Sequence, residues 1–236
     1  MISFIVPAYN EELELPATLE AIAGAAGEAG SAYEIIVVND ASTDATAEIA
    51  ARAGARVVNI HRRQIAAARN AGARQARGDI FVFVDADTRI ASVHARKAID
   101  ALAAGYAGGS ARMVLDREVP RMGKLLLQLF ATIYYANKLG AGAFFFTTRR
   151  NFEAVRGFDE QYFAGEEVFL SLALKKLGRF KILSEPMVTS GRKLRMYSGR
   201  HLWREFVRMM LGGMNSYRSR ERLDIWYDGK RESNAG

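Results

Sequence analysis

Short apolar runs alternate with helix-like stretches through the first hundred residues of the chain. The apolar runs lie at 3–6, 34–38, 56–60 and 80–84. We expect one helix after Asn10 and others over 44–53, 64–77 and 89–104. Short strands that are apolar throughout and are separated by helices are typical of a parallel sheet with both faces covered. The alternation therefore predicts an α/β fold, with a mostly parallel, Rossmann-like sheet flanked by helices.

The pattern changes after residue 105. We expect strands over 106–115 and 141–148, helices over 120–138, 166–177 and 199–213, and a pair of short strands within 180–189. In the first part, Asn10 and either Ser42 or Thr43 are expected to cap helices, because their side-chain oxygens accept hydrogen bonds from a helix N-terminus. We therefore expect residues 1–105 to form a nucleotide-binding half and residues 106–228 the half for the second substrate, with 229–236 as a disordered tail.

The composition restricts the class of protein. A length of 236 residues, half of them hydrophobic, is enough for one α/β domain with a sizeable core. The absence of cysteine excludes disulfides, thiolate metal sites and cysteine nucleophiles. A strand-like run begins directly after Met1, so we expect no signal peptide, and the longest apolar run, 125–136, is too short to span a bilayer. These features favour a cytoplasmic location.

An excess of positive charge indicates an anionic partner. The formal net charge is +7, and the excess gathers in the last quarter, at Arg192, Lys193, Arg195, Arg200, Arg204, Arg208, Arg218, Arg220 and Arg222. A nucleotide diphosphate or an acidic lipid surface would satisfy this charge, whereas nucleic acid fits poorly because aromatic residues do not interleave with the basic ones. Residues 201–211 combine aromatic, Met and Arg side chains as interfacial helices do, although core packing explains the same pattern. Peripheral contact with the inner membrane face stays open as an alternative.

An acidic pair follows the strand expected at 80–84. Asp85 and Asp87 are separated by one residue, so on an extended chain their side chains point the same way. The carboxyl ends of the strands are where open α/β sheets bind ligands. Two such carboxylates suit a hard divalent cation that shares its oxygen ligands with phosphates. The other interpretation is a polar exit from the strand with turn-forming aspartates.

Polar side chains also follow the first two strands. Tyr9 offers a flat face that could cover a base, and Glu11 could accept a hydrogen bond from a ribose hydroxyl. Asp40 follows the second strand and could accept from a base N–H, while Arg69 lies in the helix before the acidic pair. Structural roles explain such residues equally well one at a time, since Asn10 and Ser42 could be only caps and Asp40 only a turn residue. Acids at three strand ends of one parallel sheet together favour a site.

Four ordered segments of the chain resemble the consecutive motifs of family 2 glycosyltransferases. These segments are 6–12, 37–44, 68–72 and 78–87, and the resemblance runs from residue 3 to about 185. It implies a GT-A fold, a donor in which a sugar is joined to a nucleotide diphosphate, and a divalent metal, Mg²⁺ or Mn²⁺. Transfer to an acceptor hydroxyl with inversion, of the hexosyltransferase type, follows from the same resemblance.

The resemblance also assigns roles to residues. It implies that the nucleoside is bound by Pro7, Tyr9, Glu11 and Asp40. Arg69 is counted with the donor-binding residues, Asp85 with the ribose or the metal region, and Asp87 with the metal itself. In residues 163–168, Glu167 stands where the family has the Asp that acts as its base, and Phe169 stands where another acid is often found.

Glu167 is therefore the expected base and Glu166 the alternative, although two acids at the start of a helix also complement its dipole. Glu167 would take the proton of an acceptor hydroxyl as that hydroxyl attacks the anomeric carbon, and the cation on Asp87 would stabilise the departing diphosphate. Arg192, in the loop 191–195, could close over the diphosphate or simply be solvated.

The acceptor is left open, with lipid-linked and polysaccharide acceptors both allowed. A nucleotide-binding protein of the same fold without transfer activity, or a nucleotidyltransferase, are the alternative functions. No Gly-x-Gly-x-x-Gly follows the first strand, which argues against a dinucleotide-dependent dehydrogenase.

Overall fold

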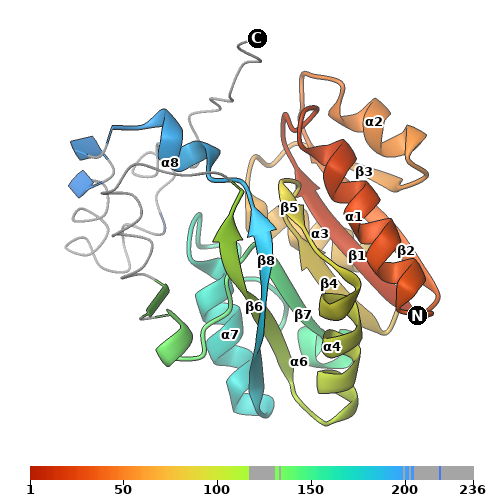
Figure 1. Ribbon diagram of the computed structural model, residues 1–236, viewed down its shortest axis with the longest axis vertical. Helices are drawn as coiled ribbons and strands as arrows, with labels where there is room; N and C mark the ends of the chain where they lie inside the picture. The colour runs from red at the N-terminus through yellow and green to blue at the C-terminus, as the bar shows by residue number, and fades with distance from the viewer. Residues whose placement is uncertain (117–130, 133, 199, 202, 205–217, 219–236) are drawn as a thin grey trace.

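The computed structural model describes residues 1–116, 131–132, 134–198, 200–201, 203–204 and 218 (Figure 1). The elements up to residue 105 are β1 (Ile2–Ala8), α1 (Leu15–Glu28), β2 (Tyr33–Asp40), α2 (Thr46–Arg52), β3 (Arg56–Ile60), α3 (Ile65–Gln75), β4 (Ile80–Val84), β5 (Thr88–Arg89) and α4 (Ser92–Ala103). Those that follow are β6 (Gly108–Leu115), β7 (Phe144–Thr148), α6 (Arg149–Ala154), α7 (Glu166–Leu177), β8 (Phe180–Thr189) and α8 (Arg192–Met196).

The strands form one continuous sheet in the order β3-β2-β1-β4-β7-β6-β8-β5. The first four strands of this order are parallel to one another. β7 is antiparallel to both β4 and β6, and β8 is parallel to β6. β5 pairs antiparallel with β8, so a strand from the first hundred residues closes the far end of the sheet. The predicted α/β fold with a mostly parallel sheet is confirmed.

The sheet is covered on both faces by helices. Successive residues of β1 alternate between two hydrophobic clusters, with Phe4 and Val6 in one and Ile5 in the other. The first cluster contains apolar residues of α1 and α4, and the second contains those of α3, α6 and α7. This alternation explains why the central strands β1 and β4 are apolar at almost every position, because neither face of these strands is left to solvent.

Helix α3 packs closely on the sheet at Gly72. A Cβ atom at this position would meet the Cγ2 atoms of Ile5 in β1 and Val38 in β2. The glycine is therefore explained by a close contact between α3 and the strands β1 and β2.

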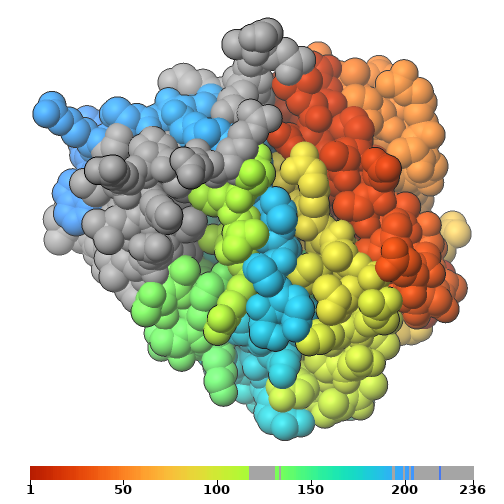
Figure 2. Space-filling model, in the orientation of Figure 1, coloured from red at the N-terminus to blue at the C-terminus, as the bar shows by residue number. Residues whose placement is uncertain are grey.

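Strands from before and after residue 105 pair at two places in the sheet, β4 with β7 in its middle and β5 with β8 at one end. Figure 2 shows residues of β8 beside residues of β5 and α4 on one continuous surface. Thr88 and Thr189 join the two strands through a hydrogen bond of 3.0 Å between their hydroxyl oxygens. Segments that are a hundred residues apart in the sequence are thus fixed next to one another.

Several local predictions were wrong. Asn10 does not cap a helix: its backbone has φ of 51°, and its side chain accepts from the backbone N–H of Thr43 at 2.8 Å, while α1 begins at Leu15. Helix α2 begins at Thr46, so neither Ser42 nor Thr43 is its cap. Residues 180–189 form one strand instead of two short ones, because the whole segment follows β6 across a bulge.

Other predictions fall on residues outside those described. The helices expected over 120–138 and 199–213 lie only partly within the described residues, and the tail 229–236 lies wholly outside them. The division at residue 105 stays a prediction. Within the described residues, no helix combines the length and the apolar character that crossing a membrane requires.

Candidate functional site

Several of the predicted site residues lie at or after the ends of strands, and these strands all end at one edge of the sheet. β1, β2 and β4 are parallel, so the residues after Ala8, Asp40 and Val84 emerge together. β8 runs in the same direction as β4, since β7 is antiparallel to β4 and to β6, and β6 is parallel to β8. The segment after Thr189 therefore reaches the same edge. Two groups of charged side chains form there.

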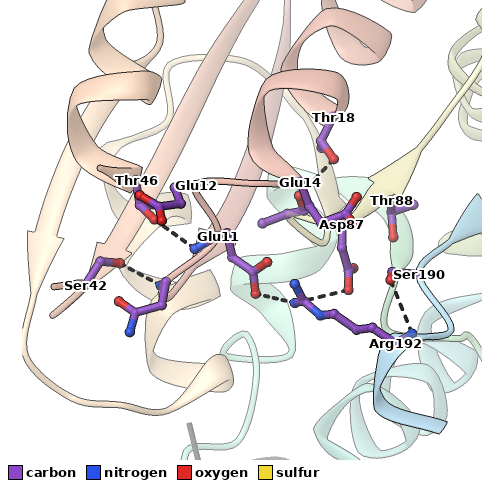
Figure 3. A network of polar contacts seen from close by, with 12 residues as sticks. Glu11, Glu12, Glu14, Thr18, Ser42, Thr46, Asp87, Thr88, Ser190 and Arg192 are labelled. Atoms are coloured by element: carbon purple, nitrogen blue, oxygen red, sulfur yellow. Dashed lines mark hydrogen bonds and ion pairs between the residues drawn. The ribbon is translucent and has the colours of Figure 1, made fainter. Parts of the chain in front are cut away.

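The first group, called here the Arg192 cluster, consists of Glu11, Asp87 and Arg192 (Figure 3). Nη2 of Arg192 lies 2.5 Å from Oε1 of Glu11 and 3.4 Å from Oδ2 of Asp87. Only 7% of Glu11 and 6% of Arg192 are exposed. A residue from the loop after β1, one from the segment after β4 and one from the start of α8 thus come together, and of the three only Asp87 is partly exposed.

Negative charge accumulates around Asp87. Burial raises the pKa of its carboxyl to about 7; Arg192 opposes the shift, and Glu11, Asp85 and Glu14 add to it. A cation bound to Asp87 would stabilise the ionised form of its carboxyl. Carboxylate oxygens are ligands that Mg²⁺ and Mn²⁺ prefer.

The protein would supply only part of the coordination of such a cation. Among the residues that the structure describes, no three His, Asp or Glu side chains are grouped so that they could hold a metal ion. A divalent cation on Asp87 would therefore take most of its ligands from phosphate oxygens and water, as such cations often do. The residues present fit a cation of this kind.

The second group, called here the Arg69 bridge, consists of Arg69, Asp85 and Glu166 and connects the end of β4 to α7. Arg69 is 1% exposed. Its Nη2 donates to Oδ1 of Asp85 and to the carbonyl oxygen of Gly142, both at 2.8 Å, and its Nη1 donates to Oε1 of Glu166 at 2.6 Å. The guanidinium also lies 5.2 Å from the ring centroid of Phe158. The side chain of Arg69 is itself enclosed, whereas its partner Asp85 is partly exposed at the sheet edge.

Two acids occupy the first turn of α7. Glu166 is 3% exposed and bound by Arg69, whereas Glu167 is partly exposed and lies 3.4 Å from the hydroxyl of Tyr134. Burial, together with repulsion from Glu166, raises the pKa of Glu167 to about 8, and Arg69 only partly offsets the shift. The pKa of Glu166 is also raised by burial. The two neighbours therefore differ in their access and in their partners.

The residues predicted to bind the nucleoside lie further along the same edge. The guanidinium of Arg63 stacks 3.2 Å from the ring centroid of Tyr9. Both oxygens of Asp40 accept hydrogen bonds from backbone N–H groups, from Arg62 at 2.7 Å and from Gln64 at 2.9 Å. Pro7 is buried inside β1 opposite Val38. The loop between β3 and α3 thus covers the ends of β1 and β2.

Sequence reasoning missed several residues at this edge. Arg63 and Gly142 lie in loops without a recognisable motif, and Tyr134 lies in a stretch that reads as an apolar helix. Glu14 adds to the negative charge around Asp87, although its own ion pair is with Arg89 at 2.8 Å. Of these residues, only Glu14 had a signal in the sequence, as a further acid directly after the first strand.

Comparison with known proteins agrees with this architecture. The family model "Glycosyl transferase family 2" matches residues 3–155, which is more than half of the chain. A curated relative, the undecaprenyl-phosphate 4-deoxy-4-formamido-L-arabinose transferase of Pseudomonas aeruginosa, is 37% identical over 114 residues, covering 45% of this chain and 33% of the relative. A dolichyl-phosphate beta-glucosyltransferase of Trichomonas vaginalis is 40% identical over 97 residues, covering 36% and 30%. The chain aligns with about a third of the length of these curated relatives.

Solved structures show the same fold. TarS (residues 1–349) of S. aureus has a TM-score of 0.65 at 20% identity, covering 97% of this chain and 78% of that one. Glucosyl-3-phosphoglycerate synthase of Mycobacterium tuberculosis, in complex with Mn²⁺, UDP and its product, has a TM-score of 0.65 at 20% identity, covering 90% and 79%. The predicted GT-A fold is confirmed by these neighbours. With the match of the family model, the chain belongs to glycosyl transferase family 2.

Proposed function

We propose that this protein transfers a sugar from a nucleoside diphosphate sugar to an acceptor. The observation that carries the proposal is the meeting of the Arg192 cluster and the Arg69 bridge at one sheet edge. The Arg192 cluster offers carboxylates to a cation. In the Arg69 bridge, Arg69 binds both Asp85 and Glu166, and so it connects Asp85 to the acids of α7. Family membership and structural neighbours solved with UDP or with GDP-mannose and Mn²⁺ support the same interpretation.

The donor would lie along the ends of β1, β2 and β4. The base would bind near Pro7, Tyr9 and Asp40, where the 62–64 loop already encloses the edge. Glu11 and Asp85 would lie next to the ribose and the diphosphate. A divalent cation, Mg²⁺ or Mn²⁺, held by Asp87 would neutralise the charge that develops on the diphosphate when the bond to the sugar breaks.

Glu167 is the better candidate for the base than Glu166. Glu166 is enclosed and already accepts a hydrogen bond from Arg69, so it has little access to an acceptor. Glu167 is the more exposed of the two and lies beside Tyr134. In its ionised form it would remove the proton from an attacking hydroxyl, and a single displacement would invert the anomeric configuration.

A phosphate acceptor is the second candidate. The curated relatives are named for undecaprenyl phosphate and dolichyl phosphate, which are lipid phosphates. A phosphate monoester is largely ionised at neutral pH, with a second pKa of about 6, so its oxygen can attack without a base. A raised pKa at Glu167 would then not slow the reaction. The two acceptor chemistries predict opposite results for a Glu167 variant.

The substitution Glu167→Gln tests both candidates. With a hydroxyl acceptor, transfer by the wild type should rise with pH through about 8, because the raised pKa of Glu167 keeps the base protonated below that value. The variant should bind donor normally and lose about 10²-fold or more in turnover, with a flat pH profile. With a phosphate acceptor, turnover should stay within a few-fold.

Product analysis distinguishes the proposed activity from its alternatives. UDP- and GDP-sugars would be incubated with Mn²⁺ and with hydroxyl or lipid-phosphate acceptors, and the released nucleotide would be identified. Release of a nucleoside diphosphate is expected. Pyrophosphate would instead indicate a nucleotidyltransferase, and binding without release would indicate a protein that has lost transfer.

A cytoplasmic protein that contacts the membrane peripherally fits a lipid acceptor. Flotation with anionic vesicles at low salt would test that contact.

A further inference from the structure

Arg192 occupies the position that the proposed function gives to a metal ion. The side chain extends from the start of α8 between Glu11 and Asp87, as Figure 3 shows, with its Nη2 atom 2.5 Å and 3.4 Å from their carboxylate oxygens. The same Asp87 would ligate the divalent cation. Two cations on this carboxylate would repel each other, so they compete for it.

The start of α8 is held in place by a second set of contacts. The backbone N–H of Ser190 donates to the carbonyl oxygen of Asp87 at 3.2 Å. Asp116, at the end of β6, accepts from the backbone N–H of Gly191 at 2.9 Å and from Nη1 of Arg195 at 3.0 Å. The short segment that carries Arg192 is therefore fixed by hydrogen bonds on both sides of this residue, and it places the Arg192 side chain beside the two acids.

The contacts of Arg192 in this position are incomplete. Its Nε atom is buried and has no hydrogen-bond partner among the described residues. An arginine has five N–H donors in a fixed fork, and it binds phosphate oxygens through two of them at once. A diphosphate bound at this edge would offer Arg192 oxygens that the carboxylates do not, and the arginine would gain by moving to them.

We propose that Arg192 is a built-in counter-cation that occupies Glu11 and Asp87 until a divalent cation arrives with the diphosphate, and that it then moves onto the phosphate oxygens. The inference rests on the proposed function. It explains how an acidic, buried site stays folded before the donor binds. It also makes binding of the metal and of the nucleotide cooperative, because the metal alone must displace Arg192 without offering it a new partner.

The test is the affinity of the full chain for Mn²⁺, measured by calorimetric titration with and without UDP or GDP. In the wild type, the nucleotide that binds should tighten Mn²⁺ binding by about tenfold. Arg192→Met removes the competing cation, so Mn²⁺ alone should bind about tenfold more tightly than to the wild type, and the coupling to nucleotide should shrink. Equal or weaker Mn²⁺ binding by Arg192→Met would overturn the proposal.

Arg195→Met is the matched control. It removes the same charge from the same helix and one of the contacts with Asp116. The backbone hydrogen bonds of Ser190 to Asp87 and of Gly191 to Asp116 do not involve the Arg195 side chain, so Arg192 should keep its place between Glu11 and Asp87. Its Mn²⁺ affinity without nucleotide should equal that of the wild type. An increase as large as in Arg192→Met would mean that loss of any α8 charge is enough, and the proposal would fail.

A second substitution covers the case in which Arg192→Met does not fold. Arg192→Lys keeps the charge, but an ammonium on a shorter side chain cannot span both carboxylates as the guanidinium does. It should be a weaker competitor, with Mn²⁺ affinity above that of the wild type, and an unchanged or lower affinity would contradict the proposal. If the wild type binds no nucleoside diphosphate even with Mn²⁺, the proposed function itself fails; if it does and the variants behave like wild type, only the present inference fails.

Discussion

At the scale of single residues, one buried arginine determines how three acids can act. Arg69 forms ion pairs with Asp85 and Glu166. Glu167 has no such ion pair with Arg69, and burial together with the charge of Glu166 raises its pKa. Burying a carboxylate without a counter-charge costs free energy. Arg69 provides this charge for Glu166 and holds it in place, whereas Glu167 can exchange a proton. The different roles of Glu166 and Glu167 follow from this pairing.

Arg69→Met should therefore destabilise the protein by about 3–5 kcal/mol, because it leaves buried acids without their partner. Urea unfolding of the wild type and the variant would measure the loss. Arg74→Met is the control, since Arg74 is an exposed arginine at the end of the same helix. A loss no larger than that of the control would contradict the role given to Arg69.

The sequence located most of these residues but not their partners. Arg69 was expected among the donor-binding residues because of its motif, and its contact with Glu166 spans 97 positions, which no local pattern reports. Likewise, Arg192 was expected near a diphosphate or solvated, whereas its contact with Glu11 spans 181 positions. Side-chain pairing across a sheet edge depends on the whole topology, and this is why the sequence placed these acids and arginines at the site but not the pairs that they form.

At the scale of elements, the predictions succeeded where the pattern is governed by burial. The strand at 80–84 and the helix at 166–177 have the expected bounds, because a largely buried apolar run defines the strand and Gly178 ends the helix. The strand at 56–60 also has the expected bounds, although none of its residues is buried. The start of the first helix was wrong because Asn10, a good capping residue, is instead used to join the loops after β1 and β2. Capping propensity is a local property, and a tertiary contact overrode it here.

The contact of α3 with the sheet gives a prediction at this scale. Gly72→Ala should destabilise the protein by about 1–3 kcal/mol, because the new methyl group would meet Ile5 and Val38, which are fixed in β1 and β2. At Gly24 in α1, an added Cβ atom would lie in open space, so Gly24→Ala should instead stabilise the protein by about 0.5–1 kcal/mol. Urea unfolding would compare the two, and a stabilising Gly72→Ala would contradict the packing described for α3.

At the scale of the whole molecule, the site depends on both halves of the chain. Glu11, Asp40, Asp85 and Asp87 come from the first hundred residues, whereas Glu166, Glu167 and Arg192 come from the last third. The pairing of β5 with β8 and the antiparallel β7 bring them to one edge. The alternation of strands and helices predicted the parallel part of this sheet, but the antiparallel insertion could not be read from it because apolar strands look alike in either direction.

The most direct test is the thermal stability of the wild type and Asp87→Asn with a panel of nucleoside diphosphates, each with and without Mn²⁺. A ligand that binds only the folded protein raises its stability, and at 100 times Kd the melting temperature of a domain of this size should rise by about 5 °C or more. Asp79→Asn, at an exposed aspartate just before β4, serves as the control. We predict a Mn²⁺-dependent shift with one nucleotide that Asp79→Asn keeps and Asp87→Asn loses. No shift with any nucleotide, or an equal shift in Asp87→Asn, would contradict the account of this edge as a metal-dependent donor site.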